Sequence, residues 1–253
     1  MQTLRDETAF DWIRSGRNEL KDSKGAGGAG NFVSHLMPPV FEAYAKILHR
    51  IEAHYENIDN PLSPQEISIL KIPPCEQLRA LVESRRDGAE GTRIKWLEVA
   101  EALDVPFSHE INHTWYGTKL QEGCWSRFLY GPSEGWLSEE ECGALISILN
   151  PFMTSPECFF RFSEWPFFNT GKARLFYGPI DGLSDLRKTS GFKISPEYWW
   201  PPNQTWCVCS DYDLKFTVVG GSRKLIAGLL LSQVVECLEV MESTRIDSLV
   251  PMP

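Results

Sequence analysis

The sequence lacks any run of about 18 or more apolar residues, the length that a membrane-spanning helix needs. Its first residues, MQTLRDETAFDWIRSGRNELK, are charged throughout and lack the apolar stretch of a secretory signal. These absences predict a cytoplasmic protein without a membrane span. The cysteines number seven in a chain of 253 residues, and an odd count in that compartment predicts reduced thiols.

Basic side chains are in short supply. Lys and Arg total 25 against 34 Asp and Glu, which gives a formal net charge of -9. A general nucleic-acid binder, or a protein that adheres to an anionic membrane, needs a broad basic surface. We therefore predict neither a nucleic-acid nor a membrane partner. The charge is compatible with a basic protein partner, although solubility alone is a commoner reason for an acidic surface.

Signatures of nucleotide binding and covalent catalysis are also missing. The chain contains no G-x-S-x-G turn and no G-x-x-x-x-G-K-[ST] loop. Gly25, Gly27 and Gly30 fit G-x-G-x-x-G, but polar residues precede them and prolines follow, so a flexible loop is predicted. All five histidines lie in the first half, away from the predicted strands. We predict no cofactor and identify no catalytic residue.

One stretch does match a catalytic pattern, because HEINH at residues 109–113 has the H-E-x-x-H spacing of zinc peptidases. On a helix, His109 and His113 would share a face and a metal, with Glu110 as general base. A proline three residues upstream and a glycine four residues downstream restrict any helix to about two turns. We interpret the stretch as a short polar helix with Ser108 as its N-cap. A zinc-dependent hydrolase is the alternative function.

Hydrophobic periodicity predicts helices in the first hundred residues. PPVFEAYAKILHRIEAHYENI, which starts at Pro38, has apolar residues at three- and four-residue spacing. CEQLRALVESRR and TRIKWLEVAEALD are further amphipathic segments. LSEEECGALISIL follows in the second half, with Ser138 and Glu141 placed as a capping box.

Beyond Pro151 the pattern becomes typical of strands. CFFRFSEW, ARLFYG, TWCVCSDY and LKFTVVG are short aromatic and β-branched runs, and TWCVCSDYDLKFTVV predicts a hairpin. The fold class predicted is α+β, with a mainly helical N-terminal half and an antiparallel sheet followed by a C-terminal helix. We expect a single domain over 1–253. A helical part, 1–130, and a sheet-containing part, 131–253, are the alternative division.

Cys207 and Cys209 stand two apart in the hairpin. Alternation along a strand places both on one face, where burial is expected. No second cysteine pair with ligand spacing accompanies them, so a structural zinc site is not predicted.

The segments EYWWPPNQTW and CSDYDL supply the predicted partner-binding residues. Trp199 and Trp200 precede two prolines, so the backbone is extended and the indoles point opposite ways. One indole could then face a groove and bind a partner, but burial of both in the core is the commoner outcome for tryptophan. Asp211 and Asp213 could bind a cation, work as acid and base, or contact a partner, but aspartates in such segments are more often turn residues.

FTVVGGSRKLI contains a predicted anion site. Gly220 and Gly221 suit a sharp turn from strand to helix, and Ser222 stands where an N-cap belongs. Arg223 and Lys224 then occupy the first helical turn, where cations oppose the helix dipole. Free N–H groups and two cations would together suit a phosphate, a sulfate or a partner carboxylate. A small-ligand binder that uses this turn is a third functional class.

The stretch YWWPPNQTWCVCSDYDLKFTVVGGSRKLIAGLL, with PPVFEAYAKILH and RIKWLEVAEAL upstream, resembles a family of uncharacterised bacterial proteins. In that family a W-W-P segment leads to a W-C-V strand, an acidic turn and a strand ending in G-G-S. MPPVFEAYAKIL is more distantly similar to the proline-led helix of SUKH-type immunity proteins, which are α+β domains. The resemblance implies no catalytic residues. We therefore expect a bacterial protein-binding or immunity-type module that meets a basic partner.

Overall fold

The computed structural model of the chain describes residues 1–18, 31–61, 63, 65–66, 75–85, 91–120, 126–163, 174–190 and 195–246. It contains two compact units. Unit 1 takes in residues 1–49 and, within the described part, 134–246, whereas unit 2 takes in residues 50–133. The α+β class is confirmed. The division differs from the predicted one at 130/131, because residues 1–49 belong with the C-terminal residues.

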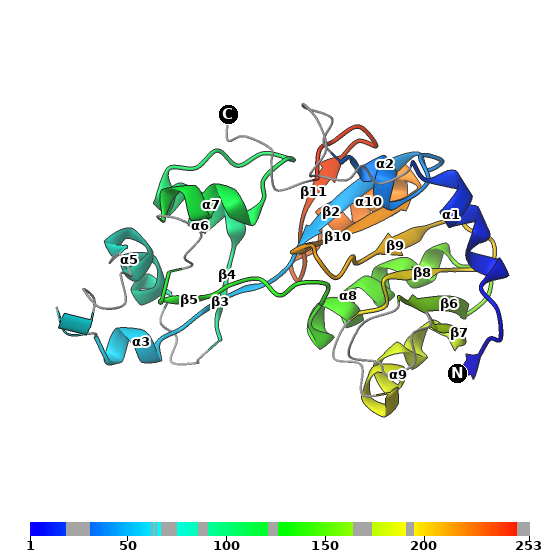
Figure 1. Cartoon of the computed structure of the whole chain (residues 1–253), viewed down its shortest axis with the longest axis horizontal. Helices are drawn as coiled ribbons and strands as arrows, with labels where there is room; N and C mark the ends of the chain where they lie inside the picture. Colours follow the sequence, from blue (N-terminus) through cyan, green and yellow to red (C-terminus); the bar gives the residue numbers. More distant parts are fainter. Residues whose placement is uncertain are drawn as a thin grey trace. The chain divides into compact units, whose positions relative to one another are not determined.

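Unit 1 is built on an eight-stranded sheet whose neighbouring strands are all antiparallel (Figure 1). Across the sheet the order is β1 (Gln2–Thr3), β7 (Arg174–Pro179), β6 (Glu157–Phe162), β8 (Tyr198–Trp200), β9 (Cys207–Cys209), β10 (Phe216–Gly221), β2 (Ala43–Leu48) and β11 (Glu236–Val240). The predicted hairpin is confirmed as β9 and β10. Since β10 and β11 are both antiparallel to β2 between them, they are parallel to each other. Helix α10 (Arg223–Leu230) provides the crossover that such a pair requires.

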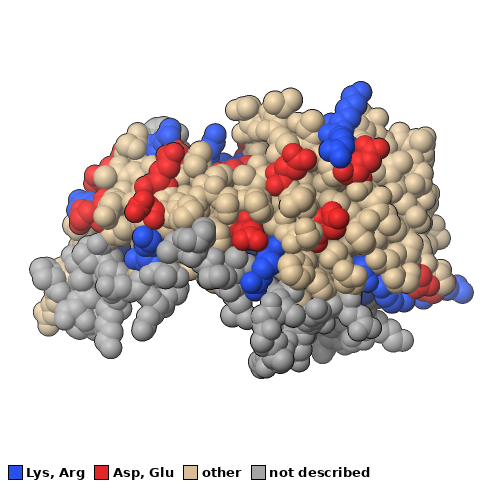
Figure 2. All heavy atoms as spheres, turned by 90° about the horizontal axis from the view of Figure 1, so that it is seen from above, with Lys and Arg blue, Asp and Glu red and all other residues tan. Residues whose placement is uncertain are grey.

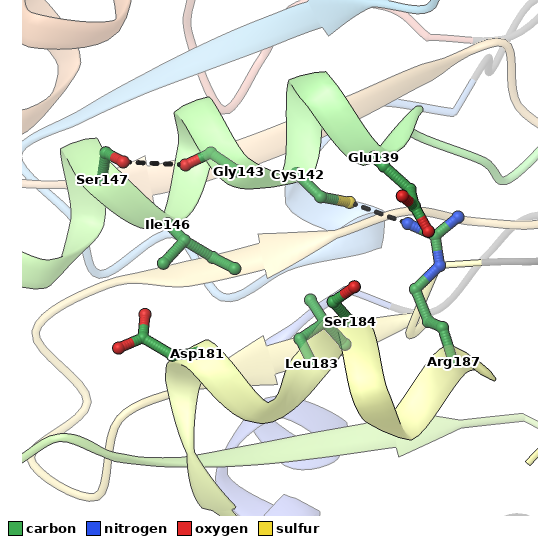
Figure 3. Close-up of a pocket in the computed structure, with 9 residues that line it drawn as sticks. All are labelled: Glu139, Cys142, Gly143, Ile146, Ser147, Asp181, Leu183, Ser184 and Arg187. Carbon is green, nitrogen blue, oxygen red and sulfur yellow. Dashed lines mark hydrogen bonds between the residues drawn. The ribbon is translucent and has the colours of Figure 1, made fainter. Parts of the chain in front are cut away.

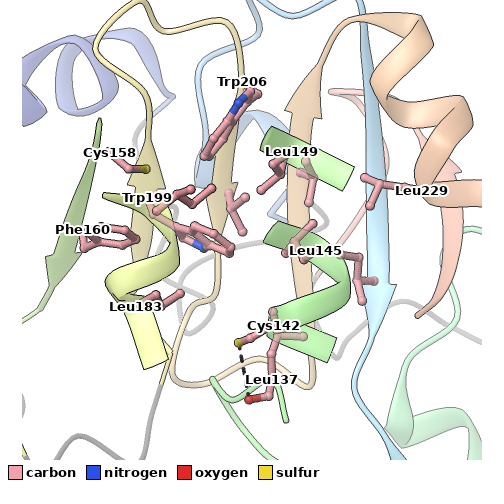
Figure 4. Packing of buried hydrophobic residues seen from close by; sticks show 14 of the residues in the cluster. Leu137, Cys142, Leu145, Leu149, Cys158, Phe160, Leu183, Trp199, Trp206 and Leu229 are labelled. Carbon is pink, nitrogen blue, oxygen red and sulfur yellow. Dashed lines mark hydrogen bonds between the residues drawn. The ribbon is translucent and has the colours of Figure 1, made fainter. Parts of the chain in front are cut away.

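Three helices cover one face of this sheet: α8 (Glu139–Leu149), α9 (Leu183–Ser190) and α10. Leu145 and Leu149 of α8 and Leu183 of α9 pack toward Phe160 and Trp199 of the strands (Figure 4). Each such side chain, once fully buried, stabilises the fold by roughly 1.5–3 kcal/mol. This layer therefore holds α8 and α9 side by side over the sheet.

The predicted capping of α8 is confirmed. The Ser138 hydroxyl accepts a hydrogen bond from the Glu141 N–H at 3.1 Å, and the Glu141 carboxylate accepts one from the Ser138 N–H at 3.0 Å. Two short 3₁₀ turns flank the neighbouring strands, η2 (Asn150–Phe152) and η3 (Ile180–Gly182).

The N-terminal elements η1 (Thr8–Phe10), α1 (Asp11–Gly16) and α2 (Val33–Leu36) pack on the opposite face of the sheet. The Phe10 ring lies 5.0 Å from the Tyr198 ring and 5.8 Å from the Trp200 ring, centroid to centroid. The Tyr198 hydroxyl donates to the Leu36 carbonyl at 2.6 Å. Both faces of the central strands are therefore covered.

Because both faces of these strands are covered, one helix predicted from the sequence is a strand in the structure. Residues 43–48 form β2, so the helix predicted from Pro38 onward is wrong over those residues. All six side chains of β2 are buried, Lys46 included. A strand buried on both faces reads as a continuous apolar run, which periodicity cannot distinguish from a buried helix.

Unit 2 contains a three-stranded antiparallel sheet of order β4 (Arg93–Ile94), β3 (Ile51–Ala53) and β5 (Leu129–Tyr130). Its helices are α3 (Glu56–Asp59), α5 (Glu76–Ser84), α6 (Trp96–Leu103) and α7 (His113–Lys119). The helices predicted in CEQLRALVESRR and TRIKWLEVAEALD are confirmed as α5 and α6. Trp96, Trp115 and Tyr116 are buried in this unit. In the part of the chain that the structure describes, no helix has the length and apolarity for crossing a membrane.

Candidate functional site

The H-E-x-x-H stretch in unit 2 does not form one helix. His109 and Glu110 lie in a turn, and α7 begins only at His113, with Asn112 as its N-cap. The Ser108 hydroxyl accepts a hydrogen bond from the Glu110 N–H at 3.4 Å, so it caps a single turn instead of a helix. The predicted helical placement of His109 is therefore wrong, because the extended backbone of Asn112 interrupts it. Within the described ranges, no three His, Cys, Asp or Glu side chains gather as metal ligands would.

The two adjacent tryptophans are both buried, so their predicted role as partner-binding residues is wrong. Trp199 packs under the helices α8 and α9, whereas Trp200 faces the other way, against Phe10, Trp12 and Phe159. The opposite directions of the indoles follow from strand alternation as expected. Neither ring can reach a partner while the sheet stays folded.

Gly220 and Gly221 are strand residues in β10, so their predicted role in a turn is wrong. Neither has the positive φ that favours glycine in sharp turns. Glycine is needed at position 220 because the side chains of Phe41 and Met37 leave no room for a Cβ. An added Cβ would lie 2.3 Å from Cδ2 of Phe41 and 2.9 Å from Sδ of Met37.

The predicted anion site after β10 is already occupied by a carboxylate of the chain. Ser222 caps α10 as expected, and its hydroxyl accepts from the Leu225 N–H at 3.2 Å. The Arg223 N–H donates to Oε2 of Glu42 at 3.1 Å. Arg223 and Lys224 are exposed. An external anion would therefore compete with Glu42 for this helix end.

Of the predicted partner-binding residues, only the two aspartates lie near the surface. Asp211 is half-buried and accepts a hydrogen bond from the Asp213 N–H at 2.9 Å, which is the turn interaction expected of aspartate. Burial raises the pKa of Asp211 above its ordinary value. Asp213 is exposed, and its charge is the largest cause that raises the pKa of Tyr212.

Next to this turn lies an aromatic and acidic surface, which we call the hairpin surface: Glu134, Trp136, Tyr212 and Asp213. Tyr212 is 37% exposed and Trp136 is 39% exposed. Gly135 brings the two segments together, since a Cβ on it would lie 2.6 Å from Cα of Tyr212, and its φ is +61°. The Gly135 N–H donates to the Leu214 carbonyl at 2.9 Å. This glycine is therefore required by close approach and by conformation together.

A second feature of unit 1 is a pocket of about 360 Å³ between α8 and α9, which we call the α8–α9 groove (Figure 3). Its lining residues are Glu139, Cys142, Gly143, Ile146 and Ser147 from α8, with Asp181, Leu183, Ser184 and Arg187 from η3 and α9. The α8 residues recur at three- and four-residue spacing, so they form one stripe of that helix. Sequence reasoning missed this site, because the facing stripe lies about forty residues further along the chain.

The two ends of the groove differ in charge. Asp181 and Ser147 lie at one end, whereas Glu139 and Arg187 lie at the other (Figure 3). Arg187 is buried and donates to the Leu137 carbonyl and to Sγ of Cys142, each at 3.2 Å. Burial raises the pKa of the Cys142 thiol to about 11, although the Arg187 charge opposes the shift. At neutral pH this thiol is therefore protonated and a poor nucleophile.

The cysteines on the strands are also poor nucleophiles. Cys207 and Cys209 lie buried on one face of β9 as expected, and Cys158 is buried in β6. Burial raises the pKa of all three thiols. The six cysteines in the described ranges are free thiols.

A half-buried ionic group ties the N-terminal segment to the sheet. Arg161 of β6 donates to Glu7 at 2.8 Å and pairs with Glu197, and its guanidinium carbon lies 4.3 Å from the centre of the Phe10 ring. Burial is the largest cause that raises the pKa of Glu197, against the lowering effect of Arg161. The arrangement stabilises packing, because its charged atoms are occupied with one another.

On the described part of the face drawn in Figure 2, charged side chains are not gathered by sign. Figure 2 shows one face of the molecule, where acidic and basic side chains stand singly or in small mixed groups. The net charge of -9 therefore does not produce a broad acidic field on this face, and recognition depends on local features.

The chain was compared with known protein families, with curated proteins and with solved structures, and none of them matches it.

Proposed function

We propose that this protein is a non-catalytic, protein-binding module of the immunity type, whose hairpin surface engages a basic protein in the bacterial cytoplasm. The observation that carries the proposal is that Tyr212 and Trp136 are both exposed on two segments that meet at Gly135, with the exposed carboxylates of Asp213 and Glu134 on the same segments. Aromatic residues are enriched at the centres of protein–protein interfaces.

The chemistry of this surface favours lysine and arginine on the partner. A cation over an aromatic ring gains roughly 0.5–1 kcal/mol at exposed sites, and flanking carboxylates add steering and register. Lys215 lies 3.8 Å from Glu134, Nζ to Oε1, and its own side chain is largely buried whereas that of Glu134 is exposed. The exposed Glu134 carboxylate can therefore also meet a partner cation.

Two further points support binding over catalysis. The buried thiols of unit 1 have raised pKa values and are poor nucleophiles at neutral pH. The resemblance to uncharacterised bacterial proteins and, more distantly, to SUKH-type immunity proteins adds an immunity role. In that role the module would hold one basic protein tightly and cover its active surface.

Site-specific photo-crosslinking in the native host tests the proposal. A benzophenone amino acid replaces Tyr212 in one variant and Leu231 in the other, a residue that is 79% exposed at the end of α10. We expect one basic protein to crosslink at position 212 and not at 231, with a yield that falls as salt screens the charges.

Three results would overturn the proposal: no crosslink at 212 above the 231 control, a crosslinked partner that is acidic, or crosslinking to nucleic acid. Retained melting temperature in both variants ensures that the comparison is made on folded protein.

A further inference from the structure

We infer that the α8–α9 groove receives a lysine side chain, with the aliphatic stem along its floor and the ammonium group at the Asp181 end. The inference rests on the proposed function for the source of the lysine, which is the basic partner. The choice of an ammonium group on an aliphatic stem rests on the lining of the groove alone.

The groove is kept open by a small residue that has no packing reason to be small. Gly143 lies inside α8, where glycine costs about 1 kcal/mol relative to alanine. An added Cβ at Gly143 would meet nothing within 4 Å. The volume of the groove, about 360 Å³, is at the small end of the range of roughly 300–1,000 Å³ for ligand sites. One long side chain or a small molecule of that size would fit.

The negative charge of Asp181 favours a cation at that end of the groove. Asp181 is exposed, and its carboxylate has no hydrogen bond or ion pair to any residue in the described ranges. The Ser184 hydroxyl, which lies beside Leu183 in the middle of the groove, likewise has no partner in the described ranges. An ammonium group needs such acceptors, whereas an anion would be repelled by Asp181 and by Glu139 at the far end.

The middle of the groove is apolar, with Ile146 and Leu183 on its sides (Figure 3). Lysine combines a flexible four-carbon stem with a compact ammonium group, so it can bury the stem while its charge stays near water. Arginine is the weaker fit, because its planar guanidinium is best satisfied by a bidentate carboxylate. Arg187 does not exclude lysine, since it lies at the opposite end and is held by Leu137 and Cys142.

The groove and the hairpin surface both belong to unit 1. Glu139, which lines the groove, follows Trp136 by three residues, and Ser138 between them caps α8.

The test uses the full chain and two blocked tripeptides, Gly-Lys-Gly and Gly-norleucine-Gly, which differ only in the ammonium group. Amide shifts of α8 and α9 are followed by NMR. We expect the lysine peptide to bind more tightly by about 1.5-fold to 5-fold, the range for an exposed ion pair. Asp181→Asn should abolish that preference.

A matched pair of variants at Gly143 tests the groove itself. Gly143→Ala keeps most of the volume and should bind the lysine peptide as the wild type does. Gly143→Leu fills the groove and should weaken binding by more than about tenfold, with folding checked by melting temperature.

Equal binding of the two peptides, or unchanged binding by Gly143→Leu, overturns the inference even if position 212 crosslinks to a basic protein. Lysine binding without such a crosslink overturns the proposed function and leaves the groove's chemistry standing. Pentane-1,5-diamine binding about a hundredfold tighter than the lysine peptide would reassign the groove to free amines.

Discussion

Gly220→Ala should destabilise unit 1, because the added methyl group has nowhere to go. The new Cβ would lie 2.3 Å from Cδ2 of Phe41, so the ring must retreat by roughly 1 Å to reach ordinary contact. The half-buried ring has aromatic neighbours that oppose this shift, since its centroid lies 6.3 Å from that of Trp12 and 5.9 Å from that of Tyr44. Met37, with its Sδ at 2.9 Å, is fully buried and blocks the other direction.

The size of the loss follows from two opposing effects. Overpacking a dense core costs about 1–3 kcal/mol. Alanine restricts the unfolded chain more than glycine does and returns about 0.4–1 kcal/mol. We therefore expect the free energy of unfolding to fall by about 1–2 kcal/mol. Urea denaturation followed by circular dichroism measures this as a lower midpoint at unchanged slope.

A double-mutant cycle with Phe41→Leu identifies the cause. If the Phe41 ring is the obstacle, the two substitutions together should cost at least about 0.5 kcal/mol less than their sum. A Gly220→Ala midpoint equal to or above that of the wild type would refute the reasoning, and additivity would place the strain elsewhere.

Three further predictions concern α8, the buried carboxylate and the thiols. Gly143→Ala should raise the free energy of unfolding by about 1 kcal/mol, because alanine is the better helix former and the added Cβ meets no other atom within 4 Å. Gly228→Ala in α10 should have the same effect, since its Cβ would meet only Ile148 at 3.7 Å. A lower free energy of unfolding in urea for either variant contradicts this prediction. Because burial raises the pKa of Glu197 above its ordinary 4.5, its contribution to stability is greatest below that pH and is lost as pH rises through the raised pKa. As pH rises from about 4.5 to about 8, the free energy of unfolding of Glu197→Gln, measured by urea titration, should therefore fall less than that of the wild type. Equal falls in the two proteins would contradict this prediction. The thiols whose pKa burial raises should react with Ellman's reagent far more slowly in native than in denatured protein, and denatured protein without reductant should show all seven cysteines free.

Elements with local signals could be predicted from the sequence. The capping box at Ser138 and Glu141 marks the start of α8, and Ser222 marks the start of α10. The hairpin of β9 and β10 was found from two strand-like runs and the turn between them. The partners lie three positions apart in the caps and 9 to 13 positions apart in the hairpin, so one short sequence window contains both partners.

The identity of β2 could not be found this way. Its backbone partners are β10 and β11, which lie more than 160 residues further along the chain. A run buried on both faces has neither the alternation of a half-exposed strand nor a polar helix face. Only the position of β2 between β10 and β11 makes it a strand, and the ring of Phe41 on Gly220 follows from that position.

The candidate sites show the same limit. The sequence by itself determined the capped helix α8, the aspartate turn and the opposite directions of Trp199 and Trp200. The tertiary structure decided that both indoles are buried, that Glu42 fills the end of α10, and that small residues of α8 face Asp181 across a groove. The reason is that helices and turns are closed by hydrogen bonds between near neighbours, whereas burial, ion pairing and cavities depend on which distant segments pack together.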